Sequence, residues 1–384
     1  MPPKTGLNIR EGRDGGAPPF ADLAAASAWH RDWLGAAAML WWTRGADHAG
    51  GGFLESLTVE GEPSPAPRRA RVQARQAWTY ANLAEAGWPG PWRQAAWHGI
   101  DYLFEKYRRG PGRIATVVSA DGAALDDTLV VYDYAFVLLA MSAVHRLGPG
   151  PRDLVAEAAA LREALDGVRH GAGGFREAGA HPFQANAHMH LLEAALAWEA
   201  AGRREWSALA DEIVAFALAR FIDGEGGFLR EFFGPDWTPA TGDDGRLVEP
   251  GHQFEWAWLL ERWGRARGRE DVRATARRLY DHGLAGVDRE RGVAVNALWD
   301  DFSLRDGHAR LWPQTEWLKA ALILNDADQA LAAARALASY FGTPARGAWR
   351  DKLRPDGGFV AEPAPASSFY HVVCAQLELF RAAG

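Results

Sequence analysis

Histidines stand near the predicted starts of helices in three segments of the chain. His252 follows the turn-forming pair Pro250-Gly251, and Glu255 lies one helical turn further on. A carboxylate beside a histidine raises the proton affinity of the imidazole and fixes its tautomer, as acid–base catalysis requires. A helix-capping His–Glu pair would give the same pattern, so this segment alone leaves both interpretations open.

Two other histidines occupy comparable positions. His371 follows two serines that can cap a helix, and the helix dipole at a first turn favours a neutral imidazole that can accept a proton. Asn186 and His190 are four residues apart and would project from one face of a helix. His188 and His190 do not converge on a helix, so the pattern does not predict a metal site. We expect the other eight histidines, among them His30, to be solvated.

Arginine is the third residue type that suits this chemistry. Arg71 and Arg75 begin an otherwise apolar helical pattern. An arginine in such a helix either forms a surface salt bridge or directs a fixed positive charge into a pocket, and the pattern leaves both open for Arg75. Histidines, a cation and carboxylates together suit proton transfer with stabilisation of a developing negative charge.

An internal repeat predicts the elements that position these residues. Gly-Gly-Phe occurs at 51–53, 173–175, 226–228 and 357–359, and weaker glycine marks stand at Gly112 and Gly292. The marks are 53 to 66 residues apart. Each interval holds about two helical patterns, and strand-like residues follow each mark. We therefore expect an all-α (α/α)6 barrel: six helical hairpins closed into a ring, with short β-hairpins on one rim and a pocket on the axis.

Composition bounds the class of protein. The chain has 384 residues, 48% of them hydrophobic, and no sequence typical of an interdomain linker, so we expect one catalytic domain over 1–384 with a loosely ordered segment at 1–20. The net charge of −7, with both signs interspersed, argues against a nucleic-acid partner. Cys374 is the single cysteine and fits a buried, inert thiol. No apolar run reaches the length of a membrane span, the first twenty residues lack the apolar core of a signal peptide, and we expect a cytoplasmic location.

Taken together, the motifs of this chain resemble the N-acylglucosamine 2-epimerase superfamily, which includes mannose isomerase, sulfoquinovose isomerase and cellobiose 2-epimerase. The resemblance runs from about residue 29 to residue 379. Its most specific motifs are Asn186-x-His-Met-His190 followed by Glu193-Ala194, and Glu249-Pro-Gly-His252-Gln-Phe-Glu255-Trp. It is supported by Arg71-x-Gln-Ala-Arg75-Gln, Tyr132 with Ala135-Phe136, Trp312-Pro-Gln-x-Glu316 and Tyr370-His371.

The resemblance implies an (α/α)6 barrel and a reaction through a cis-enediol that needs no metal and no cofactor. In such a reaction an imidazole takes the proton from C2 of an open-chain sugar, and a cation stabilises the oxyanion at O1. Return of a proton to C1 gives the ketose, and return to the opposite face of C2 gives the epimer. The implied partner is a small sugar substrate, and the protein is expected to be a monomer or a homodimer.

Residue by residue, the resemblance assigns roles to this chain. His371 matches the C2 base, His252 matches the second acid–base group with support from Glu255, and Arg75 matches the oxyanion stabiliser. The positions that bind the sugar or help to open its ring match His190 and Asn186, and the positions that contact the substrate match Tyr132, Trp312 and Glu316.

The leading hypothesis is an aldose–ketose isomerase that interconverts D-mannose and D-fructose. The nearest alternative is a 2-epimerase of mannose and glucose, of a β-1,4-disaccharide or of an N-acylhexosamine. A mannose-6-phosphate isomerase is a further alternative, with Arg68, Arg69, Arg71 and Arg75 as a candidate phosphate cluster. A glycoside hydrolase could use Glu193, Glu255 and Glu316 but would leave the histidines unexplained. A non-catalytic sugar-binding protein or scaffold would not need histidines at the starts of helices.

Overall fold

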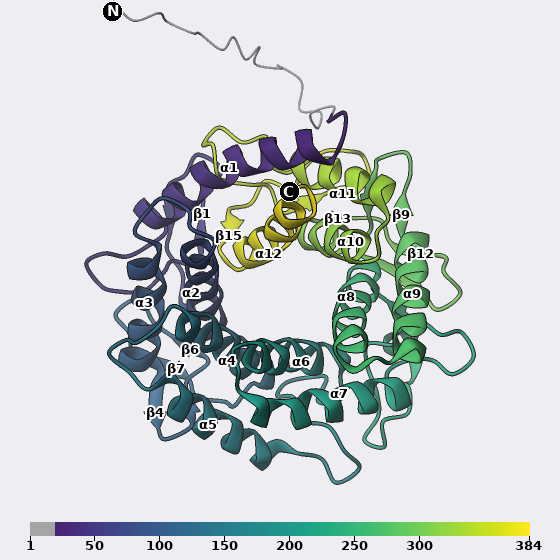
Figure 1. The fold of residues 1–384 in the computed structure, drawn as a ribbon, viewed down its shortest axis with the longest axis horizontal. Helices are drawn as coiled ribbons and strands as arrows, with labels where there is room; N and C mark the ends of the chain where they lie inside the picture. The colour runs from purple at the N-terminus through teal and green to yellow at the C-terminus, as the bar shows by residue number, and fades with distance from the viewer. Residues whose placement is uncertain (1–19) are drawn as a thin grey trace, which may run out of the picture.

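A computed structural model describes residues 20–384, and its α-helices form two concentric rings (Figure 1). The inner ring consists of α2 (Ala70–Glu85), α4 (Val131–Arg146), α6 (Ala185–Ala200), α8 (Pro250–Arg267), α10 (Leu311–Ile323) and α12 (Ser367–Ala382). The outer ring consists of α1 (Leu23–Thr43), α3 (Trp92–Tyr102), α5 (Leu154–Leu165), α7 (Ser207–Arg220), α9 (Glu270–Ala285) and α11 (Ala327–Ser339).

The inner ring closes on itself. Each inner helix packs against the next one in the chain, and α12 returns to pack against α2. Each outer helix packs on an inner neighbour, so that α3 lies on α2, α5 on α4, and so on to α1 on α12. Most residues of each inner helix are therefore buried, since these helices are surrounded by protein. The predicted (α/α)6 barrel is confirmed.

Fifteen short strands are described, and all lie in loops that lead from an outer helix into the next inner helix. Their bounds are β1 (Ser56–Leu57), β2 (Pro63–Ser64), β3 (Arg68–Arg69), β4 (Arg108–Gly110), β5 (Arg113–Ile114), β6 (Val117–Val118), β7 (Ala124–Asp126), β8 (Leu247–Val248), β9 (Val287–Asp288), β10 (Val293–Ala294), β11 (Ala297–Trp299), β12 (Leu304–Asp306), β13 (Ala309–Arg310), β14 (Lys352–Leu353) and β15 (Ala364–Pro365). These loops share the end of the barrel where the inner helices begin.

Antiparallel pairs join the loops around that rim. β3 pairs with β6, β8 with β11, β13 with β14, and β1 with β15, so the first and last loops are hydrogen-bonded to each other. Four single-turn segments complete the secondary structure: η1 (Leu103–Tyr107), η2 (Asp166–Val168), η3 (Arg204–Trp206) and η4 (Gly242–Arg246).

In five of the six inner helices, the fourth residue fastens the loop that follows a glycine mark; in α12 the fourth residue, Tyr370, donates to Glu193 instead. The amide side chain of Gln73 exchanges two hydrogen bonds with the backbone of Phe53, Gln253 does the same with Leu229, and Gln314 with Ala294. His188 in α6 accepts a hydrogen bond from the backbone N–H of Phe175, and Tyr134 in α4 accepts one from Ile114. These buried pairings satisfy backbone groups that would otherwise be unpaired.

The glycine marks permit this geometry. Gly52 has φ of 71° and Gly174 has φ of 72°, in the left-handed region that side chains disfavour. A Cβ on Gly52 would also lie 2.7 Å from Oε1 of Gln73. The repeat found in the sequence therefore marks the turn that presents each loop to its inner helix.

The structure can be compared with the expectations for individual residues and segments. His30 was expected in solvent, but it is fully buried and its ring lies between the Ala334 carbonyl and the Gln376 amide, which is a correction. Cys374 is buried and free, as expected. The expectation for residues 1–20 falls almost wholly outside the described residues. Within 20–384, no helix combines the length and hydrophobicity needed to cross a bilayer.

Candidate active site

A cavity of about 260 Å³ opens where the inner helices begin. Every predicted site residue except Glu316 lines it. Its walls are Arg75, Tyr132, Gln184, Asn186, His190, Glu231, Phe232, Glu249, His252, Glu255, Arg310, Trp312, Ser367, Ser368 and His371.

Helix geometry explains which residues reach the cavity. The second residue of α4, α6 and α10 lines it, and so does the sixth residue of α2, α6 and α8. Residues four apart lie on one face of a helix, so these two positions can point to the barrel axis, and α6 uses both of them. The second positions are Tyr132, Asn186 and Trp312, and the sixth positions are Arg75, His190 and Glu255.

His371 is held as a neutral imidazole. Its Nδ1 lies 2.9 Å from Oε1 of Glu316, which is fully buried. Burial, followed by the charges of Arg75 and Lys319, holds the pKa of His371 well below its usual range. If the carboxylate accepts the Nδ1 proton, Nε2 is left with a free lone pair. Glu316 is not among the residues that line this cavity; it lies against His371, and its predicted contact with the substrate stays a prediction.

His252 is held in the opposite state. Its Nδ1 lies 2.8 Å from Glu231 Oε2 and 3.2 Å from Glu249 Oε2. Burial alone would lower the pKa of His252, but the charges of Glu231 and Glu249 raise it to about 10. His252 is therefore protonated at neutral pH and can donate a proton. The charge of Glu255 also raises the pKa of His252, after those of Glu231 and Glu249, which are the carboxylates in direct contact with the ring.

Arg75 supplies a positive charge to the cavity. Its Nη2 donates to the Tyr132 hydroxyl at 2.5 Å and its Nη1 to the Ser367 carbonyl at 3.2 Å. The guanidinium also lies over the Phe136 ring, 3.9 Å from its centroid. No carboxylate within residues 20–384 forms a salt bridge with Arg75, whereas Arg71 pairs with Asp133 at 2.7 Å. Of the two interpretations left open by the pattern, the pocket charge fits Arg75 and the salt bridge fits Arg71.

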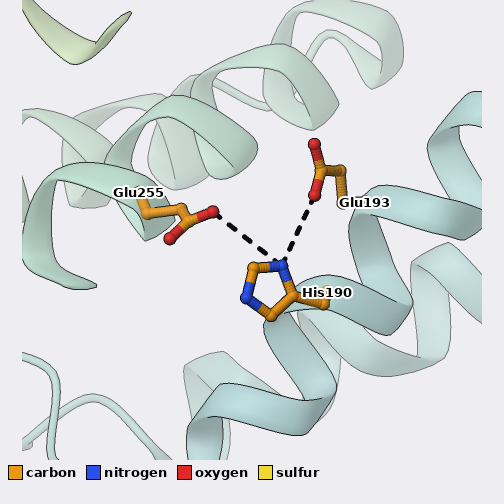
Figure 2. A group of neighbouring side chains, drawn as sticks. All are labelled: His190, Glu193 and Glu255. Atoms are coloured by element: carbon orange, nitrogen blue, oxygen red, sulfur yellow. Dashed lines mark hydrogen bonds and ion pairs between the residues drawn. The ribbon is translucent and has the colours of Figure 1, made fainter. Parts of the chain in front are cut away.

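His190 lies deeper and contacts carboxylates on two helices. Its Nδ1 is 3.5 Å from Glu193 Oε2 and 3.9 Å from Glu255 Oε1 (Figure 2). Burial lowers the pKa of His190 to about 4, so the ring is neutral. The Tyr370 hydroxyl donates to Glu193 from the opposite side. Asn186, one turn before His190, also lines the cavity.

Trp312 forms an aromatic wall between the two working histidines. Its ring centroid is 5.0 Å from that of His252 and 6.0 Å from that of His371. A flat indole face can cover the C–H face of a sugar ring or chain. The arrangement therefore offers a base, an acid and a cation around a surface suited to a polyol.

Sequence reasoning missed several groups at this site. Glu231 lies in a loop, 21 residues before the histidine that it contacts, and no helical spacing links the two. Arg310, on the cavity wall, ends a strand and pairs with Asp351 at 3.4 Å. Lys319 follows Glu316 by one helical turn, a spacing that could have indicated an ion pair on one helix face.

Comparisons with known proteins agree with this picture. The sequence model of the family "N-acylglucosamine 2-epimerase (GlcNAc 2-epimerase)" matches residues 51–375. A protein of Rhizobium meliloti (strain 1021) named "Mannose-6-phosphate isomerase" is 45% identical over 366 residues, which cover 90% of this chain and 95% of that one.

A second relative, the "D-mannose isomerase" of Thermobifida fusca, is 31% identical over 62% of this chain and 63% of its own length. Among solved structures, the cellobiose 2-epimerase of Spirochaeta thermophila DSM 6192 superposes with a TM-score of 0.83 at 22% identity, covering 94% of this chain and 97% of that one. That likeness concerns the fold.

Proposed function

Since the chain belongs to the N-acylglucosamine 2-epimerase family and is a carbohydrate isomerase or epimerase, we propose that it interconverts D-mannose and D-fructose. The observation that carries the proposal is the pair of histidines in opposite protonation states, His371 and His252, in one cavity with Arg75. An enediol reaction needs a base, an acid and a cation at the same carbonyl.

The proposed reaction moves two protons in each half. Nε2 of His371 takes the C2 proton of open-chain mannose, while protonated His252 donates to O1 and Arg75 stabilises the negative charge that develops there. The product of this half is a neutral cis-enediol. His371 then returns its proton to C1 as neutral His252 takes the O2 proton, and the C2 carbonyl of fructose forms.

A second candidate substrate is mannose 6-phosphate. It is favoured by the name of the 45% identical relative and by Arg310, whose only salt bridge in the described chain is the 3.4 Å contact with Asp351. Free mannose remains first because Arg310 is the one lining guanidinium outside the proposed catalytic centre, whereas a phosphomonoester carries nearly two negative charges at pH 7. The cluster of Arg68, Arg69 and Arg71 gives no help, because all three pair with carboxylates.

One experiment separates these substrates and outcomes. EDTA-treated protein is incubated in D2O with D-mannose or with mannose 6-phosphate, and both samples are followed by proton NMR. Fructose from mannose supports the proposal, and fructose 6-phosphate formed with much higher kcat/KM supports the second candidate. Glucose that carries deuterium at C2 would make the enzyme an epimerase. No change in either sugar would overturn both aldose–ketose proposals.

A further inference from the structure

Four ionisable side chains are buried side by side next to the cavity. They are Glu193 of α6, Glu255 of α8, and Glu316 and Lys319 of α10, and none is more than 3% exposed. The ammonium of Lys319 lies 2.5 Å from Glu316 Oε2 and 4.0 Å from Glu255 Oε1. It also lies 4.1 Å from the centroid of the Trp258 ring, a cation–π contact. The reaction proposed above makes no use of this lysine.

The carboxylates and histidines here resemble the ligand shell of a cation. His190, Glu193 and Glu255 place one ligand atom each within 4.8 Å of one another, and so do Glu255, Glu316 and His371. Figure 2 shows Glu193 and Glu255 directed at His190 from two different helices. The Lys319 ammonium contacts the two carboxylates of the second group, so the protein itself supplies a positive charge there.

That charge lowers the pKa of each carboxyl group and so opposes the effect of burial. Burial, followed by the charge of Glu316, raises the pKa of Glu255 to about 8, and burial also raises the pKa of Glu316. The charge of Lys319 opposes both increases. Burial would raise the pKa of Glu193 as well, but the hydrogen bond from His190 and the charge of Lys319 hold it at about 2. Without the ammonium, three carboxylates would share a site with no full positive charge in contact.

We propose that Lys319 is a positioning residue that keeps Glu316 ionised, so that Glu316 accepts the Nδ1 proton of His371 and leaves Nε2 free as the base. The inference rests on the proposed function only for its effect on catalysis, because the tautomer of His371 can be measured without substrate. The chain of contacts is short: Lys319 Nζ to Glu316 Oε2 is 2.5 Å, and Glu316 Oε1 to His371 Nδ1 is 2.9 Å.

Loss of the ammonium has a defined chemical consequence. A protonated Glu316 would donate its hydrogen to Nδ1 of His371, which places the ring proton on Nε2 and removes the lone pair that faces the cavity. The base would return only at a pH high enough to ionise Glu316. The ionisable groups that face Glu316, Lys319 or His371 from the packed helices, or contact Glu193 beside them, are Arg75 (α2), His190 and Glu193 (α6), Glu255 (α8), and Tyr370 and Cys374 (α12).

The test compares Lys319→Met with Lys106→Met, a control lysine in η1 that does not line the cavity and forms no salt bridge within residues 20–384. Nitrogen-15 NMR of the His371 ring should report Nδ1–H in the wild type and in the control, and Nε2–H in Lys319→Met at neutral pH. Because Lys319→Met would lack the general base at neutral pH, its kcat should fall on the order of 10²-fold, with little change in KM. The acid limb of kcat should move to higher pH in the same variant.

Two results would overturn the proposal: an unchanged Nδ1–H tautomer in folded Lys319→Met, or an unshifted pH profile. If Lys319→Met does not fold, Lys319→Ala is assayed with and without added ethylammonium, and with ethanol as the uncharged control. Recovery of activity by ethylammonium alone supports the charge role, and equal effects of both additives contradict it. A wild type with the predicted tautomer but no activity on mannose would refute the proposed function and leave the tautomer test intact.

Discussion

At the scale of the residue, the two working histidines differ because of their partners. His371 has a single carboxylate partner, Glu316, whose charge Lys319 balances, and it remains neutral. His252 has two carboxylate partners and no lysine beside them, and it remains protonated. The same side chain can therefore serve as base and as acid within one pocket.

Glu231→Gln should shift the alkaline limb of kcat/KM to lower pH. The charge of Glu231 helps to raise the pKa of His252 from 6.5 to about 10, so its removal lets His252 lose its proton earlier. The measurement is the pH profile of kcat/KM, with the exposed Glu225→Gln as the control. An alkaline limb that stays in place in Glu231→Gln would mean that His252 is not the acid.

The same raised pKa affects folding stability. A group whose pKa is higher in the folded state stabilises the protein fully below its unfolded pKa, here 6.5, and this contribution is lost as the pH rises through about 10. The free energy of unfolding should therefore decline over this interval more in the wild type than in His252→Gln. Urea titrations at several pH values measure it, and parallel declines would contradict the prediction.

Arg75→Met should lower kcat by about 10²- to 10³-fold, the loss seen when a group that stabilises an oxyanion is removed. The Tm of this variant should change little, since Arg75 forms no salt bridge in the described part of the chain. Arg204→Met, at an exposed position in η3, is the matched control for steady-state kinetics. A variant that affects KM but not kcat would assign Arg75 to substrate binding alone.

At the scale of the element, short ties between five of the six inner helices and the loops that precede them hold the site together. Gln253 fastens Leu229 with two buried hydrogen bonds, and Glu231 follows two residues later. His188 makes the corresponding tie in α6, which gives this motif histidine a structural role. Glu231, the loop carboxylate that pairs with His252, is thus positioned by Gln253, a residue that does not line the cavity.

Gln253→Ala should therefore lower both stability and activity. It leaves a buried backbone N–H and C=O without partners, at a cost of roughly 2 to 5 kcal/mol in the free energy of unfolding. Because Glu231 lies on the loosened loop, the alkaline limb of kcat/KM should also shift toward lower pH. Gln329→Ala, on outer helix α11, is the control for denaturant unfolding. Equal stability of the two variants would refute the role of the tie.

At the scale of the whole molecule, the repeat predicted the number of helical hairpins and the end of the barrel that holds the site. This was possible because the glycine marks and the two helical patterns in each interval are features of short segments, which a single sequence shows. The partners of the histidines were not predictable in the same way. Glu231 contacts His252 from a loop, and Glu316 on α10 contacts His371 on the neighbouring inner helix α12. Only the closed ring brings each histidine to its carboxylate.

The central claim is that His371 transfers the C2 proton of the sugar. The most direct measurement follows D-mannose labelled with deuterium at C2 in ordinary water, with wild type and with His371→Gln. If His371 transfers this proton, the wild type gives fructose that has lost part of its label to solvent, and the variant gives neither fructose nor label loss. Complete retention of the label at C1, together with full activity of His371→Gln, would contradict it.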